Sequence, residues 1–427
     1  MTKELVALLA EREIGRVRQD QRGRLAFTYD ERWQQAPDAY PLSLSMPLAA
    51  SEHGHATIEA FLWGLLPDNA HILDRWGRRF RVSARNAFAL IAHVGEDCAG
   101  AVQFVAPDRV KALVGGPGGT VEWLDTGGVA ERLRALRADQ SAWRRPGDTG
   151  QFSLAGAQPK TALLFQRGRW GVPSGRMPTT HILKPPTGEL AGHVENEHFC
   201  LALARELGLP AAASEVVRFD DEVAIVVERY DRLRDGGGIL RVHQEDVCQA
   251  LGIPPMKKYE SEGGPGVRHI AELLRAHSSA RDEDVARLVD SIALAWLIAG
   301  PDAHAKNYSI LIGAAGRARL APLYDVASAL PYPQLDTRRM TLAMKIGGEY
   351  RLRGVGPRQW RKLAAELRLD HAHVEARVRE LAARIPDAAA MVRRRAVGHG
   401  LRHAVIDRLP GLLTARAAQC AKLLSAA

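Results

Sequence analysis

Three residues in the second half of the chain have the types and the spacing that phosphoryl transfer requires. In the segment 300–308, Asp302 and Asn307 are separated by four residues, and Asp325 follows after a predicted strand pair. A protein-kinase catalytic loop has the same spacing between its base and a metal ligand. In such a site Asp302 would accept the proton of the attacking hydroxyl. The amide oxygen of Asn307 and the carboxylate of Asp325 would hold Mg²⁺, which prefers hard oxygen ligands.

This spacing also has an ordinary structural explanation. Asp302 comes shortly after the apolar helical run 291–299 and could simply end that helix. The pattern Asp-x-x-x-x-Asn also occurs by chance. Taken alone, the pattern favours the structural explanation, so a catalytic role depends on the features that accompany it.

Two charged residues upstream stand where a kinase would need them. Lys184 ends the strand-like run 180–184, and an ammonium group at a strand end can reach phosphate oxygens. Glu197 lies thirteen residues further on in a helical stretch and could form the lysine–glutamate ion pair of kinases. Each residue by itself could be an ordinary surface lysine or helix glutamate. Their order relative to Asp302 supports phosphoryl transfer.

A run of small residues at 153–160 could let the backbone approach the phosphates of a nucleotide. The small residues are Ser153, Ala155, Gly156 and Ala157. Their backbone N–H groups could face phosphate oxygens, and Lys160 would add a positive charge. The run is neither a Walker A sequence nor Gly-x-Gly-x-x-Gly, so a plain hairpin turn is the alternative. Further along, the segment 226–230 ends an apolar strand just before the helical region, which is where a kinase hinge presents backbone groups to adenine.

Positioning such residues requires a fold with more than one core, because 427 residues exceed the usual size of a domain. Residues 1–110 mix short alternating segments with turns, and the glycine-rich stretch 115–119 indicates a linker. Residues 152–230 alternate between strands and one helix. Beyond residue 245, apolar residues recur at helical spacing. We therefore expect an α+β, two-lobed fold with an all-helical C-terminal lobe.

We expect three parts within this fold. Residues 1–110 would form an extra N-terminal α+β subdomain. Residues 111–240 would form the N-lobe with the phosphate-binding loop and the hinge. Residues 241–427 would form the helical C-lobe with the catalytic loop.

The composition is that of a soluble globular protein, with 46% hydrophobic and 25% charged residues. A net charge of +9 would attract polyanions, but arginine-rich helix faces explain it more simply. The four cysteines are scattered without a Cys-x-x-Cys pair, which indicates reduced thiols in the cytoplasm. No apolar run approaches the roughly 18 residues of a membrane span, and the first apolar stretch meets charged residues at once, unlike a signal peptide. We expect a cytoplasmic protein with no membrane partner.

In their order along the chain, these segments resemble the HipA family of kinases. The matching motifs are Ser-Leu-Ala-Gly-Ala-Gln-Pro-Lys at 153–160, Pro-Thr-Thr-His-Ile-Leu-Lys at 178–184, Glu-Asn-Glu at 195–197, Val-Glu-Arg-Tyr-Asp-Arg at 227–232, His-Gln-Glu-Asp-Val-Cys-Gln at 243–249, Lys-Tyr-Glu at 258–260, Gly-Gly-Pro-Gly at 263–266, Asp-Ala-His-Ala-Lys-Asn at 302–307 and Leu-Tyr-Asp-Val at 323–326. The resemblance extends to Pro-Leu-Ser-Leu-Ser-Met-Pro-Leu at 41–48 and Leu-Leu-Pro-Asp-Asn at 65–69, and so covers nearly the whole chain.

The resemblance implies a role for each matching residue. Asp302 would be the catalytic base, assisted by Lys184 and Glu197, and Asn307 and Asp325 would bind Mg²⁺. The residues implied at the ATP site are Ser153, Ala155, Gly156, Ala157, Lys160, Lys184, Glu228, Tyr230, His304, Lys306, Asn307 and Asp325, with Glu228 and Tyr230 at the adenine hinge. Ser153 matches the autophosphorylated serine, whose modification expels the phosphate-binding loop and switches the kinase off.

The resemblance also implies an ATP- and Mg²⁺-dependent serine/threonine protein kinase that acts as the toxin of a toxin–antitoxin pair. The implied partners are a small helix-turn-helix antitoxin of HipB type, operator DNA reached through that complex, and a cytosolic protein substrate such as an aminoacyl-tRNA synthetase. Two alternatives remain open: a small-molecule phosphotransferase of aminoglycoside-kinase type, and a non-catalytic, DNA-bound corepressor. Phosphorylation of Ser153 would exclude the first, and turnover of ATP would exclude the second.

Overall fold

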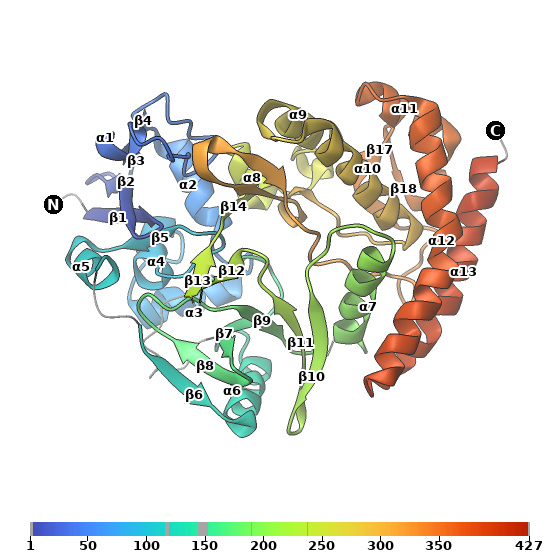
Figure 1. The fold of residues 1–427 in the computed structure, drawn as a ribbon, viewed down its shortest axis with the longest axis horizontal. Helices are drawn as coiled ribbons and strands as arrows, with labels where there is room; N and C mark the ends of the chain where they lie inside the picture. The colour runs from blue at the N-terminus through green and yellow to red at the C-terminus, as the bar shows by residue number, and fades with distance from the viewer. Residues whose placement is uncertain (1–2, 116–118, 144–152, 189, 237, 426–427) are drawn as a thin grey trace. The chain divides into compact units, whose positions relative to one another are not determined.

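The computed structural model describes residues 3–115, 119–143, 153–188, 190–236 and 238–425 (Figure 1). The chain forms two compact units, and each is assembled from separate segments. The first takes its residues from 1–185, 217–256 and 310–318, and the second from 186–216, 257–309 and 319–427. Residues 116–118 of the predicted linker lie outside the described residues. The proposed division at residues 110 and 240 stays a prediction.

The first unit begins with a five-stranded sheet in the order β4-β3-β2-β1-β5 (Figure 1). Its strands are β1 (Lys3–Leu9), β2 (Arg12–Gln19), β3 (Leu25–Tyr29), β4 (Glu52–His53) and β5 (Gln103–Val105). Along β1, Leu5, Ala7 and Leu9 belong to one apolar cluster, whereas Val6 and Leu8 belong to another. Successive side chains of a strand point to opposite faces, so this alternation buries β1 on both sides.

Helices accompany this sheet along the N-terminal segment. They are α1 (Glu31–Gln34), α2 (His55–Gly64), α3 (Ala70–Phe80), α4 (Ala87–Val94) and α5 (Val110–Leu113). The side chain of Asn69 accepts hydrogen bonds from the backbone N–H groups of His71 and Ile72 at the start of α3. Asparagine satisfies the otherwise unpaired donors of a first helical turn, which explains the asparagine of the motif at 65–69.

A second sheet has the order β10-β11-β9-β7-β8-β6. Its strands are β6 (Val121–Leu124), β7 (Thr161–Gln166), β8 (Arg169–Pro173), β9 (His181–Lys184), β10 (Ser214–Phe219) and β11 (Glu222–Glu228). Helix α6 (Thr126–Ala138) contributes Val129 and Leu133 to the same buried cluster as Leu163 and Leu183 of the sheet. The strand pattern expected after residue 152 is therefore present. The hairpin β12 (Arg232–Asp235) and β13 (Gly238–Arg241) follows it, and then β14 (His243–Asp246) and α8 (Val247–Ala250).

Two of the family-like motifs meet in the first unit. The carboxylate of Glu245 in β14 accepts hydrogen bonds from the backbone N–H of Leu44 at 2.7 Å and from the hydroxyl of Ser43. Glu245 and Ser43 are both buried, and burial raises the pKa of Glu245 to about 8. The motif at 41–48 therefore supplies the donors for a buried carboxyl of the motif at 243–249.

The second unit is mainly helical. Its helices are α7 (His193–Glu206), α9 (Val267–His277), α10 (Arg281–Leu297), α11 (Pro357–Glu366), α12 (His371–Gly398) and α13 (Ala404–Ser425). Helices α12 and α13 lie side by side, and the indole rings of Trp296 in α10 and Trp360 in α11 meet edge to face at 5.6 Å between centroids (Figure 1). Both tryptophans are fully buried and form part of the core. Among the described residues, no helix is both long and apolar enough to cross a membrane.

The α+β class is confirmed, but the expectation of an all-helical C-terminal lobe is wrong. Beyond residue 245 the chain also forms the short strands β15 (Ser309–Ile312), β16 (Ala318–Leu320), β17 (Thr341–Ile346) and β18 (Glu349–Arg351). Gly347 and Gly348 join β17 to β18 with φ angles of 56° and 87°. A two-residue hairpin loop needs positive φ at both positions, which glycine adopts without strain. This Gly-Gly pair after an apolar run was a local signal of a hairpin.

Candidate active site

The loop that carries Asp302 and Asn307 closes on its own backbone. It follows α10, and residues Ala305–Asn307 form a single 3-10 turn. The carbonyl oxygen of Asp302 accepts hydrogen bonds from the backbone N–H of His304 at 2.8 Å and from Nδ2 of Asn307 at 2.7 Å. Because the nitrogen of the Asn307 amide is bound inside the loop, its oxygen is turned away from this contact. The sequence spacing therefore gives a loop in which the Asn307 side chain has a defined orientation.

The carboxylate of Asp302 is held in one orientation by a hydrogen bond and is also accessible to solvent. Its Oδ1 accepts a hydrogen bond from the hydroxyl of Tyr259 at 2.7 Å, and Nε2 of His304 lies 3.7 Å away. The side chain of Asp302 is 62% exposed, whereas that of His304 is buried. The rings of Tyr259 and His304 meet edge to face, with 4.9 Å between centroids. Tyr259 was not predicted as a site residue, and its place in the Lys-Tyr-Glu motif at 258–260 was the signal for it.

The segment that carries Asp325 is fixed to the same loop. The hydroxyl of Tyr324 donates to the carbonyl oxygen of Lys306 at 2.7 Å and lies 2.6 Å from the hydroxyl of Ser309. Lys306 itself is buried. Asp325 has a φ angle of 52°, a conformation that few residues other than glycine adopt and that costs free energy. The structure thus brings together the loop of Asp302 and Asn307 and the segment of Asp325.

Helix α7, which carries the buried Glu197, is tied to the segment that follows Asp325. The side-chain amide of Asn196 donates to the carbonyl oxygen of Ser328 at 2.7 Å and accepts from its backbone N–H at 3.2 Å. The hydroxyl of Ser328 in turn donates to the carbonyl oxygen of Ile298, just after α10, at 2.6 Å. Asn196 is completely buried and was not predicted as a site residue. It positions α7 against the segments on both sides of the loop that carries Asp302 and Asn307.

The remaining predicted residues of the nucleotide site lie on the second sheet of the first unit. Lys184 is buried at the end of β9, opposite Ile225 of β11. Glu228 is exposed at the end of β11, opposite His181, and Tyr230 is half-buried two residues later. Because Lys184 and Glu197 belong to different units, their ion pair stays a prediction.

The loop from residue 153 to residue 160, called the phosphate loop below, docks onto the segment 65–68. The hydroxyl of Ser153 donates to the carbonyl oxygen of Leu65 at 2.6 Å, and Ser153 is fully buried. The backbone N–H of Asp68 donates to the carbonyl oxygen of Gly156 at 3.3 Å. Two motifs that are far apart in the sequence therefore meet through the Ser153 hydroxyl and through one hydrogen bond between their backbones.

Glycine is required at position 156 of this loop. Gly156 has a φ angle of 99°, and a Cβ atom there would lie 2.7 Å from Nζ of Lys160. Nζ of Lys160 donates to the carbonyl oxygen of Ala155 at 2.7 Å, so the lysine also closes the turn. The neighbouring Ala157 is exposed. The small residues of the phosphate loop thus form a tight turn around the Lys160 side chain.

A buried cluster of charges lies next to these elements and was not predicted. It consists of Asp97, Arg229, Asp231, Arg232 and Arg241, and all but the partly exposed Arg241 are buried. Nη2 of Arg232 lies 2.8 Å from Oδ1 of Asp97, and Nη2 of Arg229 lies 2.9 Å from Oδ2 of Asp231. Burial alone would raise the pKa of Asp97, but the neighbouring Arg232, Arg241 and Arg229 outweigh burial and hold it well below its usual value.

Asp97 connects this cluster to the predicted nucleotide site. Its Oδ2 accepts hydrogen bonds from the backbone N–H and the hydroxyl of Thr179, just before β9, at 3.0 and 2.7 Å. Its backbone oxygen accepts from the N–H of Ser153 at 3.1 Å. One aspartate therefore contacts the phosphate loop, the segment leading to Lys184 and, through Arg232, the end of the predicted hinge. Three residues of the Val-Glu-Arg-Tyr-Asp-Arg motif belong to this cluster, and that motif was its only local signal.

Two protein-family models match most of the chain. The HipA-like C-terminal domain family matches residues 152–389, and the HipA N-terminal domain family matches residues 5–105. The protein Y4mE of Sinorhizobium fredii is 38% identical over 387 residues, which are 89% of this chain and 90% of Y4mE. The serine/threonine-protein kinase toxin HipA of Shewanella oneidensis is 33% identical over 382 residues, 86% of this chain and 84% of that protein.

One protein of known structure has a similar fold over nearly the full length of this chain. In the complex of HipA, HipB and their operator DNA from Shewanella oneidensis MR-1, the matching chain superposes with a TM-score of 0.84 and is 27% identical. The match covers 99% of this chain and 98% of that chain. Both the α+β kinase-like fold and the resemblance seen in the sequence are confirmed. Both family domains occur in order, similar relatives match most of the chain, and the fold is similar over the full length. The chain therefore belongs to the HipA family of kinases.

Proposed function

We propose that this protein is an ATP- and Mg²⁺-dependent serine/threonine protein kinase that acts as the toxin of a toxin–antitoxin pair. The observation that carries the proposal is the arrangement in the second unit, where the loop of Asp302 and Asn307 and the segment of Asp325 are held together through Tyr324. Kinases need this set of a carboxylate base and two oxygen ligands on one rigid frame. A scaffold that only supports an antitoxin has no need of it.

Asp302 is the proposed base. Its exposed carboxylate can receive the hydroxyl proton of a protein substrate, and the hydrogen bond from Tyr259 fixes its direction. Tyr259 donates to Oδ1, and a carboxylate can accept further hydrogen bonds on both of its oxygens. His304 and Lys306 belong to the same loop and are buried.

The donor set fits Mg²⁺ and the phosphates of ATP. The amide oxygen of Asn307 and the carboxylate of Asp325 are hard oxygen ligands of the kind that Mg²⁺ binds alongside phosphate oxygens. When bound, the metal neutralises charge on the triphosphate. Lys184 and Lys160 would contact phosphate oxygens, with the backbone of Ala155, Gly156 and Ala157. Glu228 and Tyr230 would contact adenine at the hinge.

The proposed partners follow from the relatives. The similar HipA chain of Shewanella oneidensis MR-1 was solved with HipB and operator DNA, so we propose a HipB-like helix-turn-helix antitoxin and operator DNA for this protein. The proposed substrate is a cytosolic protein, with an aminoacyl-tRNA synthetase as the first to be tested.

Expression of the kinase alone should stop growth, and co-expression of a small DNA-binding protein encoded beside it should restore growth. Unchanged growth during expression of an active kinase would contradict the toxin role.

The proposed metal ligands, Asn307 and Asp325, can be tested by measuring how kinase activity depends on the Mg²⁺ concentration. Asn307→Ala and Asp325→Ala each remove one oxygen ligand, so each should raise the Mg²⁺ concentration needed for half-maximal kinase activity or stop catalysis. Asn307→Asp keeps an oxygen ligand and should be less impaired than Asn307→Ala. Wild-type titration curves for both alanine variants would place the metal elsewhere.

Ser153 is expected to become phosphorylated, and the modified protein should lose ATP affinity. Because Ser153 is fully buried, the phosphate loop must leave its docked position before the hydroxyl can react. A phosphoserine carries a charge of about −1.5 to −2 at neutral pH and cannot return to the carbonyl oxygen of Leu65. Incubation with ATP and Mg²⁺ followed by mass spectrometry maps the phosphate, and calorimetry measures ATP binding. A phosphorylated form with normal ATP affinity would contradict this regulation.

A further inference from the structure

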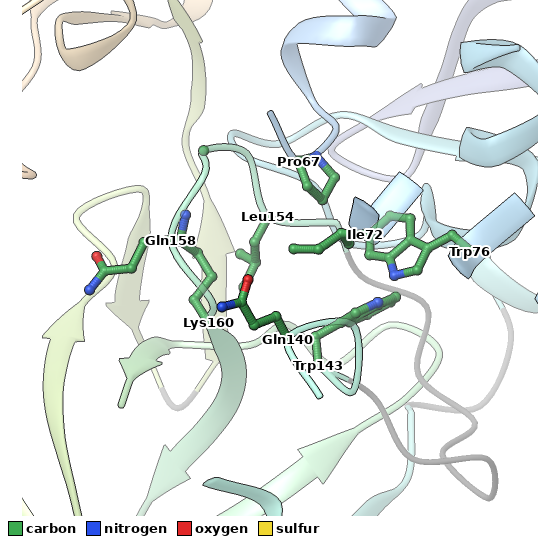
Figure 2. A pocket seen from close by; sticks show the side chains of 9 residues that line it. Pro67, Ile72, Trp76, Gln140, Trp143, Leu154, Gln158 and Lys160 are labelled. Carbon is green, nitrogen blue, oxygen red and sulfur yellow. The ribbon is translucent and has the colours of Figure 1, made fainter. Parts of the chain in front are cut away.

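Helix α3 of the first unit has one buried face and one cationic face. Ile72 and Trp76 are buried, and Figure 2 shows both side chains on the side of the helix that is turned toward Leu154 and Trp143. Arg78 follows Trp76 by two positions, which is about 200° around a helix of 3.6 residues per turn. Arg78 is accordingly exposed on the opposite side of the helix.

The cationic face continues beyond the end of α3. Between residues 70 and 95 the chain has five arginines and one acidic residue, Asp74. The backbone N–H of Val82 donates to the carbonyl oxygen of Gly77 at 2.9 Å, and a Cβ atom at Gly77 would lie 2.9 Å from the carbonyl oxygen of Val82. Glycine therefore lets the chain turn back closely against the helix. The exposed Arg81 and Arg85 follow in this turn, and a helix dipole, which favours cations only in the last helical turn, does not account for Arg85.

The turn between β2 and β3 adds two more arginines beside this segment. Nε2 of Gln19, the last residue of β2, donates to Oδ1 of Asn86 at 3.3 Å, so the turn after β2 lies next to the end of the arginine-rich segment. Arg22 and Arg24 in this turn are exposed. The carboxylate of Asp20 accepts from the backbone N–H groups of both arginines at 2.8 Å, so it is engaged within the turn.

Two segments of the first unit thus present one set of exposed arginines. We call this set the arginine surface, and its members are Arg22, Arg24, Arg78, Arg81 and Arg85. Across the described residues, none of their guanidinium groups has an ion pair or a hydrogen bond. Other exposed arginines of the same unit are paired, for example Arg12 with Asp38 and Arg134 with Asp221. Neighbouring positive charges repel each other, and a partner with several negative charges removes this repulsion.

The chemistry of the arginine surface fits the phosphate backbone of DNA. A guanidinium group is a planar fork that binds two phosphate oxygens at once. No large apolar side chain of the described segments 20–24 and 74–86 is exposed, whereas binding to a membrane surface requires apolar side chains that insert. The rings of Phe80 and His93 stack on each other with centroids 4.6 Å apart, so they do not form the open platform on which single-stranded bases stack.

We propose that the arginine surface binds the phosphate backbone of double-stranded DNA without reading its sequence. The choice of DNA among polyanions rests on the proposed function, in which an antitoxin brings the chain to operator DNA. The inference gives this chain a DNA contact of its own. Phosphate contacts add affinity at any sequence, whereas base contacts select the operator.

The proposal is tested with the purified full chain, in the absence of ATP and of any antitoxin. Fluorescence anisotropy measures its binding to a labelled DNA duplex at increasing NaCl concentration. Five phosphate contacts predict a slope of about −4.5 for the logarithm of the binding constant against the logarithm of the salt concentration. The affinity should therefore fall about 500-fold between roughly 50 and 200 mM NaCl.

The combined variant Arg78→Gln, Arg81→Gln and Arg85→Gln keeps two of the five contacts. Its slope should be about −1.8, so its affinity should fall only about 12-fold over the same range of salt. The thermal midpoint should stay near that of the wild type, because the three side chains are exposed and have no ion pair among the described residues.

The matched control is the combined variant Arg353→Gln, Arg358→Gln and Arg368→Gln in the second unit. It removes the same charge from three exposed arginines that also lack an ion pair among the described residues. Each triple includes one residue with positive φ, 57° at Arg81 and 51° at Arg368, so the two variants also match in backbone conformation. The control should keep the slope of the wild type.

Three results would overturn the arginine surface as a duplex DNA site. They are equal slopes for the two triple variants, equal affinity for single-stranded DNA of the same length, and loss of binding to phosphatidylserine vesicles in the first variant without any binding of DNA. Kinase activity is measured separately and should be the same in both triple variants and the wild type. A chain that binds DNA as expected but transfers no phosphate would leave this site standing and contradict the proposed kinase.

Discussion

Replacing Asp302 by asparagine is expected to lower the rate of phosphoryl transfer by about 10² to 10⁴, which corresponds to about 3 to 5 kcal/mol of activation free energy. Asparagine has the shape of aspartate but cannot accept the proton of the attacking hydroxyl. The fold should survive, because the Asp302 side chain is exposed and its backbone oxygen still accepts from Asn307. The rate is measured with purified protein and labelled ATP, and the thermal midpoint is measured alongside it.

Tyr259→Phe provides a graded control for this experiment. It removes the hydroxyl that donates to Asp302 at 2.7 Å and leaves the base in place. We expect a loss of about tenfold, the lower end of what one hydrogen bond to a charged group contributes, because the exposed carboxylate can accept from water instead. An Asp302→Asn protein with wild-type turnover would remove Asp302 from the role of base. An inactive protein for both wild type and variant would favour the corepressor alternative.

Replacing Asp97 by asparagine is expected to destabilise the first unit by about 3 to 5 kcal/mol, the usual cost of removing one partner from a buried ion pair. The change leaves Asp231 as the only carboxylate among three arginines of the cluster. It should also weaken ATP binding, because the Asp97 carboxylate accepts both hydrogen bonds that fix Thr179 just before β9. Urea unfolding followed by circular dichroism gives the stability, and calorimetry gives the ATP affinity.

The loss of stability in Asp97→Asn should depend on pH in a defined direction. Because the folded-state pKa of Asp97 is lowered, its charged form stabilises the fold at pH values above the ordinary aspartate pKa of about 4. That stabilisation declines as the pH falls below this value, so the difference between wild type and Asp97→Asn should shrink in acid. Asp38→Asn serves as the control in the same unit, because Asp38 forms an exposed ion pair with Arg12 and its loss should leave unfolding almost unchanged. Equal effects of the two substitutions would contradict the importance of the buried cluster.

The sequence by itself determined the features that depend on local pattern. The spacing of Asp302 and Asn307 is enough to close the loop through the Asn307 side chain, because the hydrogen bonds to the Asp302 carbonyl oxygen come from residues at most five positions away. The strands after residue 152 and the helices beyond 245 follow from apolar periodicity. The hairpin of β17 and β18 was also encoded locally, in Gly347 and Gly348, although a helical lobe was expected.

Only the tertiary structure decided which distant residues support the site. Tyr259 and Asp302 are 43 residues apart, Asn196 and Ser328 are 132 apart, and Asp97 and Arg232 are 135 apart. Which donors and acceptors meet over such separations depends on the path of the whole chain. Periodicity also cannot tell a buried arginine from an exposed one, because burial of a charge depends on a partner that arrives from another segment. The loop that carries Asp302 and Asn307 could therefore be predicted from the sequence, whereas the contacts of Tyr259, Asn196 and Asp97 required the folded chain.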